Sequence, residues 1–406
     1  MSGALIQPFK GLLYNPAKID DIAHCVCPPY DVIADPEPYY QRSPYNAIRL
    51  ELPMATPTET PYDVAARTLD EWLEKSILRL DDRPAVYGYE QDFQIGATWH
   101  TRRGFIAAVR LDRERLLTHE ETRLEAKKDR GQLIGRLNAF TSLVFGLFDD
   151  PDGAIGRLLA GASTSLLYDF SDELSIRNRF YRIEDAPVTD RLTGLMEEKY
   201  IYVADGHHRL SVAFKIGIPY VAVYLTEMHS PGIAILPYHR TVTLKLKRNI
   251  GQLLQSVEGF LDVAREPLDN DGISAELTER IGACANTRYV LVARDDPGHA
   301  YVLTQKKPLL EDADMHPSLR RLRVNIAHAG ILKRLLGVTE EEISFAKDAE
   351  DAHAAVREGG ADFALLVPPT TVDEVKEIAE HRLYMPPKST YFYPKILTGL
   401  VFHKYA

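Results

Sequence analysis

Short apolar runs alternate with helical repeats along the chain, and this pattern predicts a mixed α/β protein. Apolar residues recur at helical spacing over residues 60–80. Strand-like apolar runs follow at residues 86–93, 104–110 and 144–148, and the second of these is nearly continuous, as in a buried strand. The first part of the chain is therefore expected to form an α/β unit. Residues 158–192 show no pattern that assigns them to helix or strand.

The later part of the chain predicts a second α/β unit. The expected elements are strands at 220–226, 233–240, 289–294, 299–304 and 361–367 and helices at 250–261, 325–336 and 371–381. Thr371 is the expected N-cap of the last helix, with Asp373 and Glu374 in its first turn. We place the boundary at the start of a basic and apolar stretch, which gives domains at residues 1–240 and 241–406.

The most informative stretch is residues 200–217, where an apolar strand-like run stops abruptly. The run ends in five residues suited to phosphate or proton chemistry, namely Asp205, Gly206, His207, His208 and Arg209. Apolar residues then recur at helical spacing up to Gly217. The five residues are thus predicted at a strand-to-helix turn, where free backbone N–H groups and the helix dipole stabilise an anion. An ordinary Asp-Gly turn with two surface histidines is the alternative.

Two other segments are candidates for chemistry. His119 and Glu120 follow a predicted buried strand, but Thr118 as N-cap with Glu121 at N3 explains the same stretch as the start of a helix. Near the end of the chain, two prolines precede a lysine and two hydroxyls among aromatic residues, namely Lys388, Ser389 and Thr390. Such a grouping is typical of a small-ligand pocket, although a terminal strand with scattered polar residues is also compatible with it.

Composition narrows the possible partners. The 406 residues carry a formal net charge of −10 with 45% hydrophobic residues, which indicates a globular protein and argues against bulk binding to nucleic acid or anionic membrane. A signal sequence and an apolar run of the ~20 residues needed to span a bilayer are both absent from the sequence, so a cytoplasmic protein is expected. Cys25, Cys27 and Cys284 are sparse and odd in number, as expected of reduced thiols. A metal site at His24, Cys25 and Cys27 is disfavoured, because no second Cys or His pair follows at the spacing of metal ligands.

Three motifs, in order, resemble those of the free serine kinases in the ParB/sulfiredoxin superfamily. Residues 203–209 resemble their D-G-H-H-R signature, residues 118–120 their P-H-E loop and residues 387–390 their P-K-T-T segment. The chain is also similar to a widespread bacterial and archaeal family with P-P-Y-D-V at 28–32, A-D-G-H-H-R at 204–209 and M-P-P-K-S-T at 385–390. The resemblance implies a ParB/sulfiredoxin-like nucleotide-binding core with an N-terminal extension, followed by a C-terminal α/β domain.

The resemblance also implies an activity, namely phosphoryl transfer from ATP or ADP to the hydroxyl of free L-serine or a similar metabolite. Glu120 would be the base, and the catalytic set would also include His119 and Asp205. Residues 205–209 would hold the nucleotide phosphates, and Lys388, Ser389 and Thr390 would hold the phosphates or the amino-acid carboxylate. Mg²⁺ would bridge the phosphates, and Asp205 is a hard oxygen ligand of the kind that Mg²⁺ prefers.

Two alternatives remain beside the kinase. One is a nucleotide-binding regulatory module without phosphotransfer, against which the presence of Glu120 argues. The other is a metal-dependent hydrolase built on His119, His207, His208 and Asp205, since imidazole and carboxylate groups ligate zinc. The chain is longer than the serine kinases, with over a hundred residues before Glu120 and a long insertion after it, so the acceptor and the oligomeric state stay open.

Overall fold

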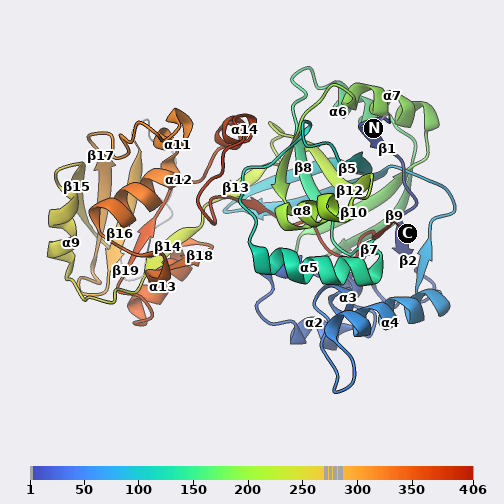
Figure 1. The fold of residues 1–406 in the computed structure, drawn as a ribbon, viewed down its shortest axis with the longest axis horizontal. Helices are drawn as coiled ribbons and strands as arrows, with labels where there is room; N and C mark the ends of the chain where they lie inside the picture. Colours follow the sequence, from blue (N-terminus) through green and yellow to red (C-terminus); the bar gives the residue numbers. More distant parts are fainter. Residues whose placement is uncertain (1–2, 269–272, 274–276, 278–280, 282–286, 406) are drawn as a thin grey trace. The chain divides into compact units, whose positions relative to one another are not determined.

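The computed structural model describes residues 3–268, 273, 277, 281 and 287–405, and the chain divides into two compact units (Figure 1). Unit 1 consists of Met1–Ala234 and Pro394–Ala406, and unit 2 of Ile235–Tyr393. Both units combine helices with β-sheet, so the predicted mixed α/β class is confirmed. The division differs from the expected one at two places, because residues 235–240 belong to unit 2 and the last residues of the chain return to unit 1.

Unit 1 is built on a mixed nine-stranded sheet with the order β6-β11-β8-β12-β5-β4-β10-β9, and β1 pairs with β5 outside this path. The strands are β1 (Ile6–Gln7), β4 (Tyr87–Ile95), β5 (Thr98–Arg110), β6 (Leu116–Leu117), β8 (Val144–Phe148), β9 (Thr164–Ser171), β10 (Arg177–Ile183), β11 (Ile201–Asp205) and β12 (Tyr220–Glu227). The apolar runs predicted as strands at residues 104–110, 144–148 and 220–226 form the buried parts of the central β5, β8 and β12. β11 runs parallel to β6 and antiparallel to β8.

The helices of unit 1 cover this sheet and continue into an N-terminal layer. They are α1 (Ile22–Cys25), η1 (Tyr30–Val32), α2 (Glu37–Arg42), α3 (Ile48–Glu51), α4 (Pro61–Glu74), α5 (Leu124–Leu137), α6 (Ala154–Ala160), α7 (Ala186–Met196) and α8 (His207–Ile216). Figure 1 shows α8 against the sheet, with α5 packed beside it and α4 beyond α5. Leu210, Val212 and Ala213 of α8 are buried in one cluster with Val144 of β8 and Val203 of β11. This packing fixes the start of α8 at the edge where β11 ends.

Two short pairings join distant parts of unit 1. β2 (Leu12–Tyr14) pairs with β3 (Leu78–Leu80), and β21 (His403–Lys404) pairs with β7 (Ala139–Phe140). Thr398 also forms an isolated bridge with Cys27. The C-terminal segment is therefore part of the hydrogen-bonded framework of unit 1, which is the physical reason for its place in that unit.

Unit 2 contains a six-stranded sheet with the order β15-β17-β16-β19-β14-β18. Its strands are β14 (His239–Val242), β15 (Leu261–Pro267), β16 (Arg288–Ala293), β17 (His299–Gln305), β18 (Ile343–Ala346) and β19 (Phe363–Leu366), and β13 (Ala234–Leu236) pairs with β20 (Tyr391–Tyr393) where the chain enters and leaves the unit. Its helical segments are α9 (Ile250–Val257), α11 (Pro317–Arg321), α12 (Arg323–Asn325), η2 (Ile326–Leu335), η3 (Glu340–Glu342), α13 (Ala349–Arg357) and α14 (Val372–Glu380). Arg240 of β14 pairs with Leu365 of β19 and Phe345 of β18, which places residues 239–242 in unit 2.

Several local expectations are settled by the structure. Thr371 caps α14 in a full capping box with Glu374, as predicted. The alternative of a capping box at Thr118 is excluded, since α5 begins at Leu124 after Arg123, which caps it without a side-chain bond. Residues 118 and 119 instead lie in a loop.

The cysteine predictions are settled only in part. Cys25 is the last residue of the short helix α1. Cys25 and Cys27 are buried free thiols. Cys284 lies outside the described residues.

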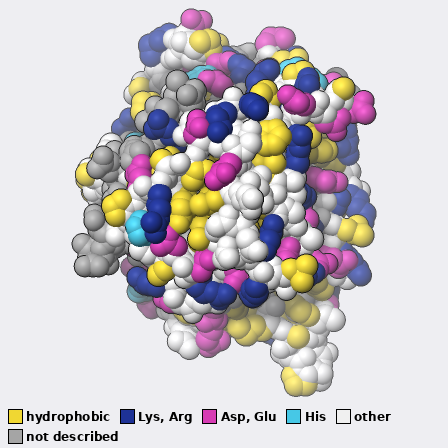
Figure 2. Space-filling view, turned by 90° about the vertical axis from the view of Figure 1, so that its left-hand side faces the viewer, with side chains coloured by type: hydrophobic (Ala, Val, Ile, Leu, Met, Phe, Trp, Pro, Cys, Tyr) yellow, Lys and Arg dark blue, Asp and Glu magenta, His cyan; other side chains and the backbone are white. Residues whose placement is uncertain are grey.

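The surface carries both signs of charge. On the described residues of the face in Figure 2, Lys and Arg side chains are interspersed with Asp and Glu, and several apolar side chains gather between them. Among the described residues, no helix combines the length and the hydropathy needed to cross a membrane.

Candidate functional site

The turn between β11 and α8 depends on a glycine. Gly206 adopts φ +88° and ψ +24°, a left-handed conformation that glycine reaches without steric cost. A Cβ at this position would lie 3.2 Å from both Arg209 Nε and Val144 Cα, which is closer than nine in ten Cβ contacts in proteins. The backbone thus turns sharply from strand to helix, and Gly206 packs against the side chain of Arg209 and the backbone of Val144. The predicted strand, turn and helix are confirmed up to the helix end at Gly217.

Asp205 is the electrostatic centre of this turn. One of its carboxylate oxygens accepts a hydrogen bond from Arg209 Nη2 at 2.8 Å, and the other accepts one from Lys395 Nζ at 2.6 Å. Burial raises the pKa of Asp205, but the charges of Lys395 and Arg209 outweigh it and hold the pKa well below its usual range. The carboxylate is therefore ionised at neutral pH and lies between two cations.

The loop with His119 and Glu120 faces the same turn. β6 and β11 are parallel, with Leu116 opposite Ile201, so the residues that follow both strands emerge at one edge of the sheet. His207 Nδ1 lies 3.8 Å from Glu120 Oε2, and the rings of His207 and His119 meet edge to face with centroids 4.7 Å apart. The structure thus brings together two segments that are more than eighty residues apart in sequence.

Both histidines at this contact are buried. Burial lowers the pKa of His119 to about 3 and that of His207 to about 4, so both rings are neutral at neutral pH. A neutral imidazole donates from one nitrogen only and accepts with the other. His207 Nε2 is buried and has no hydrogen-bond partner among the described residues.

His208 and Arg209 connect the turn to other elements. His208 Nε2 accepts a hydrogen bond from the backbone N–H of Arg123 at 3.0 Å, which ties α8 to the start of α5. Arg209 Nη1 donates to the carbonyl of Leu143 at 2.6 Å, and its side chain is 5% exposed. Burial lowers the pKa of Arg209, but the charge of Asp205 and that of Asp31 raise it more. Asp31 belongs to the P-P-Y-D-V motif, whose role the sequence left open.

That motif packs into a buried polar cluster beside the turn. The guanidinium carbon of Arg130 lies over the ring of Tyr30, 4.3 Å from the ring centroid. The backbone N–H of Tyr30 donates to Glu51 Oε1 at 3.4 Å. Arg130 Nη1 donates to the carbonyl of Glu51 at 2.8 Å, and Thr141 donates to the Glu51 carboxylate. Glu51 and Arg130 are 1% and 3% exposed, so this cluster holds the N-terminal layer rigidly against α5.

Lys395 is the site residue that sequence reasoning missed. It lies in the extended segment after Pro394, 190 residues from Asp205 in the chain. Lys388, Ser389 and Thr390, the predicted clamp, belong to unit 2. There the Ser389 hydroxyl donates to the carbonyl of Pro386 at 2.6 Å, and Lys388 Nζ lies 5.1 Å from the Tyr238 ring centroid.

A magnesium ion does not fit Asp205 in this arrangement. Each of its carboxylate oxygens already accepts a hydrogen bond from a cation, and a magnesium ion at either oxygen would be repelled by the charges of Lys395 and Arg209. In the part of the chain that the structure describes, no group of three or more His, Cys, Asp or Glu side chains is arranged to hold a metal. The set of His119, His207, His208 and Asp205 considered for a hydrolase is therefore not such a group.

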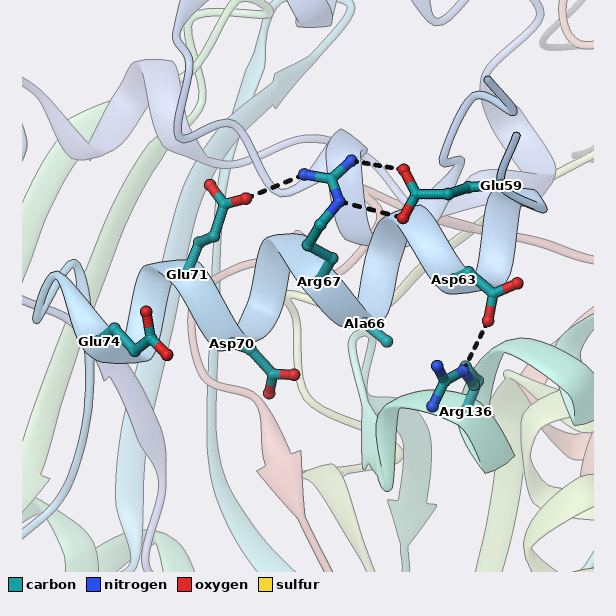
Figure 3. Close-up of a pocket in the computed structure, with 8 residues that line it drawn as sticks. All are labelled: Glu59, Asp63, Ala66, Arg67, Asp70, Glu71, Glu74 and Arg136. Atoms are coloured by element: carbon teal, nitrogen blue, oxygen red, sulfur yellow. Dashed lines mark hydrogen bonds and ion pairs between the residues drawn. The ribbon is translucent and has the colours of Figure 1, made fainter. Parts of the chain in front are cut away.

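Two depressions in the surface of unit 1 lie away from these residues. One is lined by residues of α4 together with Glu59 and by Arg136 of α5 (Figure 3). Arg67 bridges Glu59 and Glu71 there, while Arg136 pairs with Asp63 at 2.8 Å. The other is lined by residues around Tyr14, Asp81 and Arg182. None of the lining residues of either depression belongs to the turn.

Comparisons with known proteins give a family and a distant fold likeness. The model of the family described as "Protein of unknown function (DUF1015)" matches residues 6–324. No curated protein matches the chain. Similar solved structures include a conserved hypothetical protein from Pyrococcus furiosus, a free serine kinase in complex with AMP, and SbnI from Staphylococcus aureus with a C-terminal truncation.

The structural likeness is weak in numerical terms. The three proteins are 14%, 13% and 11% identical to this chain, with TM-scores of 0.35, 0.37 and 0.38. The matches cover 72%, 71% and 73% of this chain and 92%, 86% and 86% of the other chains. A free serine kinase variant is in complex with ADP. A likeness of this degree fixes neither a ligand nor a reaction for this chain.

Proposed function

The chain belongs to the DUF1015 family, and we propose that it is a small-molecule kinase that transfers a phosphoryl group from ATP or ADP to the hydroxyl of free L-serine or a similar metabolite. The observation that carries the proposal is the approach of Glu120 to the start of α8, where its carboxylate lies 3.8 Å from His207. A carboxylate thereby stands next to a turn that suits phosphate.

Three features of the turn support phosphate binding there. The N-terminus of α8 presents backbone N–H groups and the positive end of its dipole. Gly206 has no side chain, so a ligand can approach the backbone closely. Arg209 and Lys395 place two positive charges at Asp205. Phosphoryl transfer depends mainly on such positioning and charge stabilisation, since it needs little covalent help from the protein.

The proposed step uses Glu120 as general base. The acceptor hydroxyl oxygen forms a bond to the terminal phosphorus while the bond from that phosphorus to the nucleotide oxygen breaks. The hydroxyl proton passes to the carboxylate of Glu120, and the nucleotide leaves as ADP from ATP or as AMP from ADP. Arg209 and the first N–H groups of α8 would stabilise the oxygens of the transferred group, and His207 and His119 would hold the Glu120 loop against the turn.

Product detection tests this proposal. The full chain is incubated with magnesium, ATP or ADP, and each of a panel of free hydroxylated amino acids, and the mixture is analysed by mass spectrometry. O-phosphoserine, or the phosphate ester of another panel member, is the expected product. Nucleotide binding without any phosphorylated product would favour the regulatory module instead.

The variant Glu120→Gln separates catalysis from binding. Because the amide keeps the shape but cannot take the proton, turnover is expected to fall by about 10²- to 10⁴-fold while ADP affinity is retained. Glu121→Gln is the matched control, since Glu121 is the exposed neighbour in the same loop. Equal turnover in the two variants would refute Glu120 as the base.

A further inference from the structure

The carboxylate of Asp205 contacts two cations. Lys395 and Arg209 each donate to one of its oxygens, so two positive charges meet one negative charge. The three side chains are little exposed, at 10%, 5% and 16% for Lys395, Arg209 and Asp205. Buried charges are normally compensated, because removing them from water is costly. Asp31 and Glu51 also act on Arg209, and an anion at the turn would meet both cations next to the N-terminus of α8.

Two buried polar atoms at the same turn point to a missing ligand. Arg209 Nε and His207 Nε2 are both buried and have no hydrogen-bond partner among the described residues. Arg209 Nε lies 3.2 Å from the place that a Cβ of Gly206 would occupy, so the guanidinium edge faces the residue that caps α8. A buried polar atom without a partner is unfavourable, and here two such atoms lie at one turn. An anion at the turn would supply one for Arg209.

Lys395 is held in position without any ligand. Arg102 donates to the carbonyl of Pro394 at 2.6 Å, and Gln91 donates to the carbonyl of Lys395 at 3.3 Å. Three residues later, Thr398 exchanges two backbone hydrogen bonds with Cys27, of 2.8 and 3.2 Å. The segment that carries Lys395 is thus fixed on both sides to the framework of unit 1. A cation held in this way binds an anion with little loss of conformational entropy.

We propose that Lys395 is a phosphate-binding residue of this site and that Asp205 holds Lys395 and Arg209 in place, rather than ligating a magnesium ion. The inference rests on the proposed function in taking the anion to be the phosphates of a nucleotide. Phosphate adds negative charge where two cations flank one carboxylate, which is favourable. A divalent cation at Asp205 would instead meet an ammonium and a guanidinium at the same carboxylate.

Calorimetric titrations with ADP and with inorganic pyrophosphate, both in excess EDTA, test the inference. The wild-type chain is expected to bind both. Lys395→Met should weaken pyrophosphate binding by about ten- to a hundredfold, the loss expected for one charge-assisted contact, whereas Lys395→Arg should retain most of the affinity. Lys215→Met is the matched control, because it removes the same charge from the exposed far end of α8. Its affinity should equal that of the wild type.

The Asp205→Asn variant distinguishes an anchor from a metal ligand. The inference predicts weaker pyrophosphate binding in EDTA, because Lys395 and Arg209 lose their common partner. A magnesium ligand would behave differently: pyrophosphate binding in EDTA would be unchanged, and more magnesium would be needed for ADP binding. That second result would overturn the inference.

The outcomes separate this inference from the proposed function. Pyrophosphate binding that depends on Lys395, with no binding of ADP, would support the inference and sink the nucleotide function. Wild-type protein that binds neither probe, or a Lys395→Met variant that binds pyrophosphate as well as wild type does, would overturn the inference itself.

A measurement on the unmodified chain covers the case in which Lys395→Met fails to fold. Pyrophosphate should slow the reaction of Lys395 with an amine-reactive acylating reagent, as measured by mass spectrometry. The acylation rate of Lys215 should stay unchanged. Equal rates at Lys395 with and without pyrophosphate would contradict the inference.

Discussion

Replacement of Asp205 by asparagine should destabilise unit 1 strongly. The change keeps the shape of the side chain but leaves Lys395 and Arg209 without the negative charge that both of them contact. Breaking a buried ion pair costs about 3 to 5 kcal/mol. The amide oxygen still accepts from one donor and the site is 16% exposed at Asp205, so we expect about 3 kcal/mol, the lower end of that range.

Tryptophan fluorescence during urea unfolding measures this loss. The two tryptophans of the chain, Trp72 and Trp99, both lie in unit 1, and Trp72 is buried against Tyr14 and Tyr45. The signal therefore reports the unfolding of unit 1, and linear extrapolation gives its free energy. Asp70→Asn is the control, since Asp70 is exposed on α4 and should change stability by no more than about 0.5 kcal/mol.

A double-mutant cycle makes the same prediction sharper. The double variant Asp205→Asn with Lys395→Met no longer contains the ammonium that Asp205→Asn leaves without its carboxylate. Its loss of unfolding free energy should therefore be smaller than the sum of the two single losses by about 1 kcal/mol or more. Asp205→Asn could instead lose no more unfolding free energy than Asp70→Asn, with additive losses in the cycle. That result would refute the ion pairs of Asp205 with Lys395 and Arg209.

Two further predictions concern the histidines and the turn glycine. The folded-state pKa values of His207 and His119, about 4 and 3, lie below the ordinary 6.5, so the unfolded chain takes up their protons first and stability should fall as pH drops from about 6.5 towards 4. For His207 this amounts to about 3 kcal/mol, and His207→Gln should flatten the pH dependence of urea unfolding; an unchanged slope would contradict the buried neutral ring. Gly206→Ala should cost more stability than Gly217→Ala, because both have positive φ but only the Cβ at 206 meets Arg209 and Val144, while at 217 there is open space. The left-handed conformation alone costs about 1 kcal/mol, so equal losses in the two variants would show that the turn is not tightly packed.

The parts of the fold with a strong local pattern could be predicted from the sequence. β8 was placed at its observed bounds, and the run from β11 through Gly206 to the end of α8 was predicted because polar residues, glycines and apolar spacing agree there. The sequence left open whether residues 118–121 form a loop or the start of a helix. Thr118 has the local signature of a cap, but His119 is buried against His207, and the chain stays out of the helix until Leu124.

Non-local contacts account for what the sequence did not reveal. β6 and β11 pair over two residues each, and this short parallel contact decides that Glu120 faces the turn. Lys395 is separated from Asp205 by 190 residues and stands in an extended segment without a motif of its own. The prediction of a ligand-binding clamp at residues 388–390 came from their lysine and hydroxyls and from the resemblance to the P-K-T-T segment. The lysine that contacts Asp205 lies seven positions further on.

A crystal structure of the full chain with ADP tests the central claim most directly. The account predicts the terminal phosphate within hydrogen-bond distance of the first backbone N–H groups of α8 and of Lys395, with Glu120 facing it. Phosphates bound elsewhere on the molecule, with the Asp205 to Arg209 turn untouched, would contradict it.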